Sequence, residues 1–144
     1  MSSYQIRADY ASHGPDAQRL QDAIDHYNLS TTGVREFWPI TLSLRNAEGT
    51  LCGGLVGMVW AGWLHVQVLW LEPELRGSGH GSQLLQAAED YAYRRGARHA
   101  HLSSFTFQAP GFYQKHGYEV FGELSDFPSG QSQVFLQKAL RAEP

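Results

Sequence analysis

The sequence has little of several features that mark common classes of protein. Cys52 is its one cysteine in 144 residues, which rules out an internal disulfide and fits a reducing cytoplasm. No apolar run is long enough to cross a membrane or to resemble a signal peptide. Neither sign of charge dominates, because 11 Lys and Arg stand against 14 Asp and Glu. With a net charge of −3 and no basic stripe, the chain is not expected to bind nucleic acid.

The length predicts one domain over residues 1–144, large enough to bury a core without a disulfide or metal. Expected strands cover residues 4–10 at an edge, 37–45, 50–60, 63–71, 98–105, 118–124 and 133–140, and expected helices begin at Pro15, near Gly79 and at Pro110. Short turns between the strands up to residue 71 favour an antiparallel meander, and the strand–helix–strand unit that follows favours a right-handed parallel crossover. The pattern therefore predicts an α/β (α+β) fold, with a mixed sheet flanked by helices.

The segment from Leu69 to Ser82 is the most informative part of the sequence. A hydrophobic strand runs into a loop, an amphipathic helix follows at once, and glycine recurs at alternate positions: Gly77, Gly79 and Gly81. Glycine lets the backbone approach a ligand closely, and a helix start presents free N–H groups and partial positive charge. A tight turn without a ligand is the alternative. Three alternating glycines at a helix start favour a main-chain cradle for phosphate.

Two common phosphate-binding motifs do not fit this loop. A P-loop requires a Lys after its last glycine, and no Lys follows Gly81. The dinucleotide fingerprint requires G-x-G-x-x-G, whereas the spacing here is G-x-G-x-G. The loop therefore predicts a site for a phosphorylated cofactor that is neither a P-loop nor a dinucleotide-binding motif.

Two segments resemble motifs of the GCN5-related N-acetyltransferase (GNAT) superfamily. The pattern R-x-x-G-x-G over residues 76–81, behind L-x-P-E over residues 71–74, resembles its acetyl-CoA loop. Residues 109–118 resemble its later motif A-x-x-x-Tyr-x-x-x-Gly-aromatic, and in element order the resemblance covers residues 36–140. It implies the GNAT fold, which is a mixed, mostly antiparallel sheet of six to seven strands with a central splay, flanked by about three to four helices.

The resemblance implies acetyl-CoA (coenzyme A) as the cofactor. Loop N–H groups would hold its pyrophosphate, and its pantetheine arm would pair with the strand that ends at Leu71. Arg76 would contact a phosphate or brace the loop. Thr106 replaces an asparagine that many relatives carry, which weakens the case for a side-chain contact there. The residues expected to bind the cofactor are Leu69, Trp70, Leu71, Arg76, Gly77, Ser78, Gly79, His80, Gly81, Ser82, Thr106 and Tyr113.

Transfer of an acetyl group to an amine needs few protein groups, because the thioester is already activated and positioning supplies much of the rate. An acid can protonate the departing thiolate. Tyr113 is the expected acid, since a phenol with a pKa of about 10 keeps its proton at neutral pH. The resemblance supports this role, because the family often uses a tyrosine at this position. The alternative is a core aromatic residue beside Phe112.

The amine must also lose a proton before it attacks, which calls for a base. Alternation places five residues on one face of their strand: Trp63, His65, Gln67, Leu69 and Leu71. His65 and Gln67 put polar groups on that face, and a histidine has a suitable pKa for the task. His65 is therefore the expected base, with a hydrogen-bonded structural histidine as the other interpretation. Glu36, Glu72 and a water relay are weaker alternatives.

A pair of histidines on the strand over residues 98–105 raises the question of a metal. His99 and His101 share one face of that strand, as a metal-binding pair would. No Cys or carboxylate cluster joins them in the sequence, so no metal site is expected.

The residues and the resemblance together predict a cytoplasmic, acetyl-CoA-dependent N-acetyltransferase. It would transfer an acetyl group to a primary amine of a small molecule or a protein by direct attack on the thioester. The alternatives are a non-catalytic acyl-CoA-binding sensor or scaffold module, and a structural domain with a vestigial loop. No membrane partner is expected, and a homodimer stays open because family members are often dimers. Aminoglycosides, polyamines, amino acids and protein N-termini stay open as acceptors, and so does a longer acyl-CoA as donor.

Overall fold

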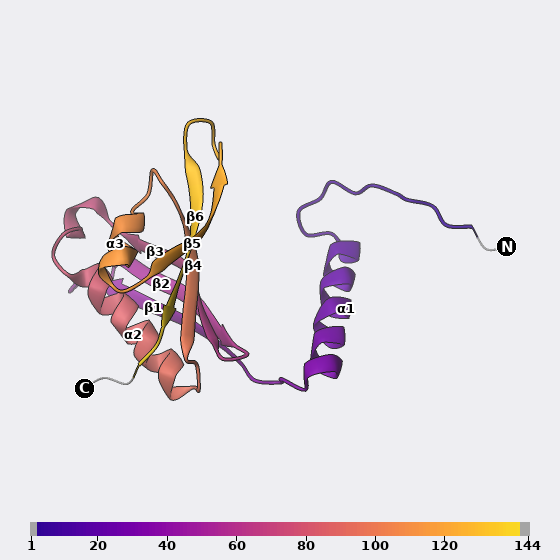
Figure 1. The fold of residues 1–144 in the computed structure, drawn as a ribbon, viewed down its shortest axis with the longest axis horizontal. Helices are drawn as coiled ribbons and strands as arrows, with labels where there is room; N and C mark the ends of the chain where they lie inside the picture. The colour runs from indigo at the N-terminus through magenta and orange to yellow at the C-terminus, as the bar shows by residue number, and fades with distance from the viewer. Residues whose placement is uncertain (1–2, 142–144) are drawn as a thin grey trace. The chain divides into compact units, whose positions relative to one another are not determined.

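The computed structural model describes residues 3–141, and the chain divides after Arg35 into two compact units, which we describe separately (Figure 1). The expectation of one domain over residues 1–144 stays a prediction. The second unit, from Glu36 onward, holds the sheet and every residue of the expected cofactor and catalytic sets.

The first unit contains one helix, α1 (Pro15–Thr32). It begins with a proline at its first position, where the missing N–H costs nothing. It ends at Gly33, whose φ of 70° is left-handed and whose N–H donates to the Leu29 carbonyl at 2.8 Å. Its apolar side chains recur at helical spacing, and none of its residues is buried.

The prediction of an edge strand at residues 4–10 is wrong. This segment is described and carries no strand, and Tyr4, Ile6 and Tyr10 are exposed. Alternating side chains indicate which face of a strand would be buried, but a strand forms only when its backbone groups pair with a neighbour.

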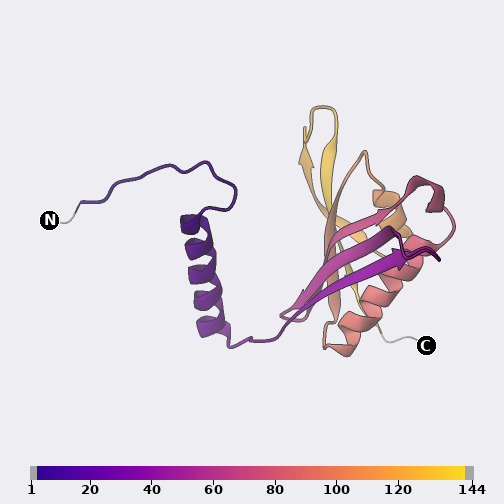
Figure 2. The same cartoon turned by 180° about the vertical axis from the view of Figure 1, so that it is seen from behind.

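The second unit is built on a six-stranded sheet in the order β1-β2-β3-β4-β6-β5 (Figures 1 and 2). The strands are β1 (Phe37–Arg45), β2 (Leu51–Trp60), β3 (Trp63–Leu71), β4 (His99–Phe105), β5 (Glu119–Ser125) and β6 (Ser132–Ala139). All neighbouring strands are antiparallel except β3 and β4, which are parallel. The predicted mixed, mostly antiparallel sheet is confirmed.

Two helices lie on one face of this sheet, as Figures 1 and 2 show from opposite sides. Helix α2 (His80–Arg94) connects β3 to β4 through a short 3-10 turn (Pro73–Leu75), and it packs against β1, β2 and β3. Helix α3 (Pro110–Lys115) follows β4 and precedes β5 along the chain. We call the opposite face of the sheet the far face.

The parallel pairing of β3 with β4 is short. It covers three residue pairs, from Trp63 with His99 to His65 with His101. Beyond His65 the edge of β3 that faces β4 has no partner strand in the sheet. The resemblance implied a central splay, and this opening confirms it.

A bulge in β3 lies at the start of the opening. Val56 of β2 pairs with Val68, whereas the next residue, Gly57, pairs with Val66, so Gln67 is an extra residue in β3. A Cβ atom at Gly57 would lie 2.8 Å from the His65 carbonyl oxygen, so glycine is required for this close approach.

The bulge makes one sequence prediction wrong. Trp63, His65, Gln67, Leu69 and Leu71 were expected to share a face. Leu69 pairs with Leu55 of the core, and both Leu69 and Leu71 pack against that core. His65 pairs with Met58 on the far face. An inserted residue reverses the alternation that follows it, which sequence spacing alone does not reveal.

The core lies between α2 and the sheet. It is formed by buried apolar side chains from the helix and from four strands: Leu55, Val59, Leu64, Val66, Leu84, Leu85, Ala88, Ala92, Ala100, Leu102, Val134 and Leu136. Burial of a leucine-sized side chain contributes about 2 kcal/mol each. This packing fixes where the N-terminus of α2 sits relative to β3.

One charged residue lies inside this apolar contact. Glu89 of α2 is 6% exposed. Its carboxylate accepts a hydrogen bond from the Tyr118 hydroxyl at 2.8 Å and pairs with the Lys138 ammonium at 2.7 Å. Burial, with the adjacent Glu89 carboxylate, raises the pKa of Tyr118. The three groups join α2 to β6 and to the start of β5.

We expect Glu89→Ala to lower the free energy of unfolding by about 3 kcal/mol, because it leaves a partly buried ammonium without its partner. Urea unfolding followed by circular dichroism measures the change. Gln86→Ala, one turn earlier on the exposed side of α2, should stay within about 0.5 kcal/mol. The double variant Glu89→Leu, Lys138→Met should be more stable than Glu89→Ala. Equal losses in the two would contradict the assignment to an unpaired charge.

Candidate functional site

The glycine loop folds into an uncapped helix start. Gly77 and Gly79 have φ values of 80° and 92°, which a residue with a side chain rarely adopts. Gly79 is the N-cap of α2, no side chain caps the helix there, and the Gly79 carbonyl accepts the first helical bond from Gln83 at 3.0 Å. The N–H groups of the next three residues, His80, Gly81 and Ser82, therefore have no acceptor within the helix.

The loop has the properties of an anion site. A Cβ atom placed at Gly77 or Gly79 would meet nothing within 4 Å, so the backbone is open on that side. The His80 Nδ1 atom is buried without a hydrogen-bond partner among the described residues. Three free N–H groups at the positive end of a 15-residue helix fit a diphosphate.

Arg76 braces this loop. Its Nε donates to the Leu71 carbonyl at 3.0 Å, and its guanidinium carbon lies 4.6 Å from the centre of the Trp70 ring. The side chain thus fastens the start of the loop to the end of β3. Of the two roles that the sequence left open for Arg76, the bracing contact is the one observed.

Helix α3 is fastened to the same loop. A Cβ atom at Gly81 would lie 3.3 Å from the Phe112 ring, so α2 and α3 approach closely here. The Ser82 Oγ and His116 Nε2 atoms are 2.9 Å apart, and the His116 ring packs 4.8 Å from that of Phe112. Any shift of the loop is therefore transmitted to α3.

Tyr113 lies on α3, on the same side of the sheet as the loop. Its ring packs edge-on against Phe112 and Tyr118, and burial raises the pKa of its hydroxyl. A raised pKa keeps the phenol protonated at neutral pH, as an acid requires. Tyr118 is 2% exposed and packs in the core.

His65 and His101 form a stacked pair on the far face. Their ring centres are 4.4 Å apart, with 10° between the planes, at the last residue pair before β3 and β4 separate. Burial lowers the pKa of both rings, and the neighbouring His65 lowers that of His101 further. Both rings are therefore neutral at pH 7 and can accept a proton.

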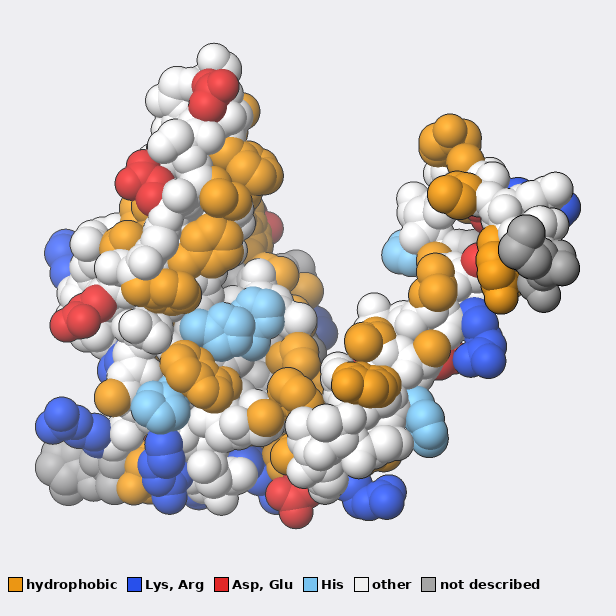
Figure 3. Space-filling model, turned by 45° about the vertical axis from the view of Figure 1, so that its right-hand side comes forward, with side chains coloured by type: hydrophobic (Ala, Val, Ile, Leu, Met, Phe, Trp, Pro, Cys, Tyr) orange, Lys and Arg blue, Asp and Glu red, His pale blue; other side chains and the backbone are white. Residues whose placement is uncertain are grey.

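The stacked pair belongs to a row that crosses the far face. Residue pairing places Met58, His65, His101, Gln137 and Glu119 side by side on successive strands. A second stack, Trp63 on His99 with ring centres 4.7 Å apart, lies two residues earlier on β3 and β4. Figure 3 shows histidine side chains gathered near the middle of one face, with hydrophobic side chains around them. No group of three metal-ligating side chains occurs among the described residues.

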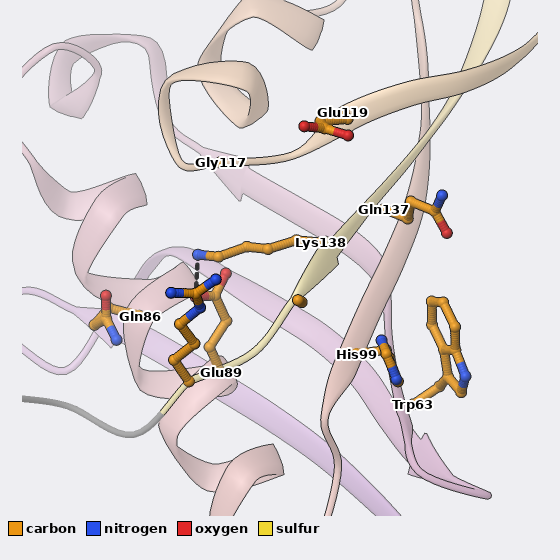
Figure 4. A pocket seen from close by; sticks show the side chains of 10 residues that line it. Trp63, Gln86, Glu89, His99, Gly117, Glu119, Gln137 and Lys138 are labelled. Atoms are coloured by element: carbon orange, nitrogen blue, oxygen red, sulfur yellow. Dashed lines mark hydrogen bonds and ion pairs between the residues drawn. The ribbon is translucent and has the colours of Figure 1, made fainter.

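A cavity of about 1040 Å³ lies near this row, and Figure 4 shows its lining. Glu89 and Lys138 meet on one side of it, and Trp63 and His99 lie together on another. Sequence reasoning missed Glu89, although a charged residue inside the apolar stripe of α2 was the available signal.

The structure brings most of the predicted residues together around the start of α2 and places two of them elsewhere. Around the helix start lie Leu69, Trp70, Leu71, Arg76, Gly77, Ser78, Gly79, His80, Gly81, Ser82 and, on α3, Tyr113. His65 lies across the sheet, on the far face. The Thr106 hydroxyl is used locally, since it accepts from the Ser132 N–H at 3.0 Å and donates to the Gln131 side chain. The assignment of these residues to the cofactor stays a prediction.

Several known proteins resemble this chain in sequence and in fold. Residues 41–120 match the family described as Acetyltransferase (GNAT) domain. Blasticidin-S acetyltransferase of Streptomyces morookaense is 40% identical over 78% of this chain and 85% of its own, and acetyltransferase Atu2258 of Agrobacterium fabrum is 34% identical over 83% and 87%. The crystal structure of an acetyltransferase from Bacillus cereus superposes with a TM-score of 0.82 at 35% identity, over 93% of this chain and 98% of that one. Among the described residues, every helix is too short or too polar to cross a membrane.

We expect imidazole titrations by NMR to place the pKa of His65 and His101 below their usual value of 6.5. The unfolded chain then takes up protons first as the pH falls below that value, so the wild type should lose stability between pH 7 and 5. The double variant His65→Asn, His101→Asn should lose less over the same range. An equal loss would show that other groups cause the pH dependence.

Proposed function

Because the chain belongs to the GNAT acetyltransferase family, we propose that it transfers an acetyl group from acetyl-CoA to a primary amine of a small molecule. The observation that carries the proposal is the uncapped N-terminus of α2, set against Leu71 at the end of β3, where β3 and β4 have separated. The Streptomyces relative is named for a small molecule, blasticidin-S, which favours a small-molecule acceptor over a protein.

The helix start and the free edge of β3 would hold the cofactor. The N–H groups of His80, Gly81 and Ser82 would bind its diphosphate. Between His65 and Leu71 this edge of β3 has no strand partner among the described residues, so its backbone groups other than the Leu71 carbonyl, which Arg76 occupies, are free to pair with the amide arm. Acetyl-CoA supplies an activated thioester, and the protein supplies its position.

Tyr113 is suited to protonate the departing sulfur. It lies on α3, whose contacts with Gly81 and Ser82 tie it to the loop. No hydrogen bond engages its hydroxyl among the described residues, so the proton is available. Burial raises its pKa, which keeps the hydroxyl in its donating form.

His65 is suited to take the proton from the amine. It lies on the far face, whereas the loop and Tyr113 lie on the helix side, and the amine and the thioester would meet where β3 and β4 separate. The acceptor would approach from the far face and the cofactor from the helix side.

Release of CoA in the presence of amines tests the proposal. With acetyl-CoA and a panel of primary amines, we expect steady thiol release that requires both substrates. Acetyl-CoA should also raise the melting temperature, because it binds only the folded protein. Gly79→Trp should abolish both effects while the far-ultraviolet circular dichroism is kept. A raised melting temperature without turnover across the panel would indicate a non-catalytic binding module instead.

Tyr113→Phe should lower kcat by about 100-fold, because it removes the donated proton while it keeps the ring. The KM for acetyl-CoA should change by less than about threefold, since uniform binding is not affected. Tyr93→Phe, toward the other end of α2, serves as the matched control and should leave kcat unchanged. Unchanged turnover in Tyr113→Phe would remove this residue from the mechanism.

A further inference from the structure

The far face carries a feature that the transfer reaction alone does not require. From it we infer that the acceptor amine carries a flat aromatic or heteroaromatic ring. The ring would stack on an aromatic shelf formed by Phe105, Phe107 and Phe127, beside the histidine pair. The inference rests on the proposed acetyltransferase activity and specifies the acceptor of that same site.

The shelf is a cluster of three phenylalanine rings. Phe105 and Phe107 stack with their centres 5.2 Å apart and 13° between their planes, and Phe127 lies 5.2 Å from Phe105 at 49°. Phe107 and Phe127 are 58% and 46% exposed. Rings whose faces are left open offer a flat ligand the offset or edge-on contacts that aromatic pairs prefer.

The shelf lies on the same side of the sheet as the expected base. His101 and Phe105 lie on the same face of β4. They are four positions apart, which corresponds to about 13 Å along a strand. Figure 3 shows hydrophobic side chains over the β5–β6 hairpin that continue down to the histidines. An acceptor with its amine at the opening between β3 and β4 would reach the shelf through a short linker.

Hydrogen bonds hold the shelf rigid. The Thr106 N–H donates to the Ser132 carbonyl at 2.8 Å, and the Ser132 N–H donates back to the Thr106 hydroxyl at 3.0 Å. The Phe127 N–H donates to the Gln131 carbonyl at 2.9 Å. Both segments of the shelf are thus fastened to the same turn before β6. A binding surface that is already ordered loses less entropy when a ligand stacks on it.

The composition of the surrounding surface favours a ring over a sugar or a polyamine. Phe135 follows on the neighbouring strand and packs against Phe121 at 6.4 Å. Hydroxyl-rich acceptors need polar partners, which this aromatic surface offers in small number. Glu119 lies at the edge of the same face and gives a protonated amine a favourable approach.

A matched pair of substrates tests the inference. The amines 4-phenylbutylamine and 4-cyclohexylbutylamine have the same linker and differ in whether the ring is flat and aromatic. We expect the wild type to favour the phenyl compound about tenfold in kcat/KM, which is the upper range of aromatic pairing energies. Phe107→Leu keeps apolar bulk and should reduce this preference to below about twofold. Phe37→Leu, an equally exposed phenylalanine on β1, should keep it.

The outcomes separate the two proposals. If amines are acetylated without a preference for the phenyl compound, the aromatic shelf is not the acceptor site, while the acetyltransferase activity stands. If Phe107→Leu changes the oligomeric state by light scattering and leaves the preference intact, the shelf is a contact between chains and the inference is overturned. If no amine of the broader panel releases CoA, the proposed function itself fails.

Discussion

The early separation of β3 from β4 is the constraint on which the rest of the site depends. Parallel pairing ends after His65 and His101, which leaves one edge of β3 with backbone groups that need partners. The bulge at Gln67 turns the strand at this point, and the Arg76 side chain occupies the Leu71 carbonyl at its end. A closed ladder here would remove the free strand edge.

The two faces of the sheet carry different side chains, because α2 and α3 pack on one face only (Figure 1). On the helix side are the free N–H groups of α2 and the Tyr113 hydroxyl, with its raised pKa. On the far face are the neutral His65 and His101 rings and the exposed Phe107. The Tyr113 hydroxyl and the two imidazole rings therefore lie on opposite sides of the sheet. The network around Glu89 holds α2 against β6 and so stabilises this division.

Much of the fold was predictable because its signals are local. The turn signals and alternation located all six strands of the second unit, and the glycines located the start of α2. The failures have physical reasons. Residues 4–10 alternate but pair with no strand in the described part of the chain, and the extra residue at Gln67 places Leu69 and Leu71 opposite to their expected face. Glu89 was not singled out because its partners Tyr118 and Lys138 lie far along the chain.

The sequence by itself determined the glycine loop and the uncapped helix start, because positive φ values at Gly77 and Gly79 and unpaired N–H groups at a helix start depend on neighbouring residues only. It also determined that Tyr113 would lie on a short helix beginning at Pro110. Only the tertiary structure decided that His65 stacks on His101, and that Phe105 and Phe127 form one surface. Those contacts join strands and turns that are distant in the chain, and strand register and a single bulge set them.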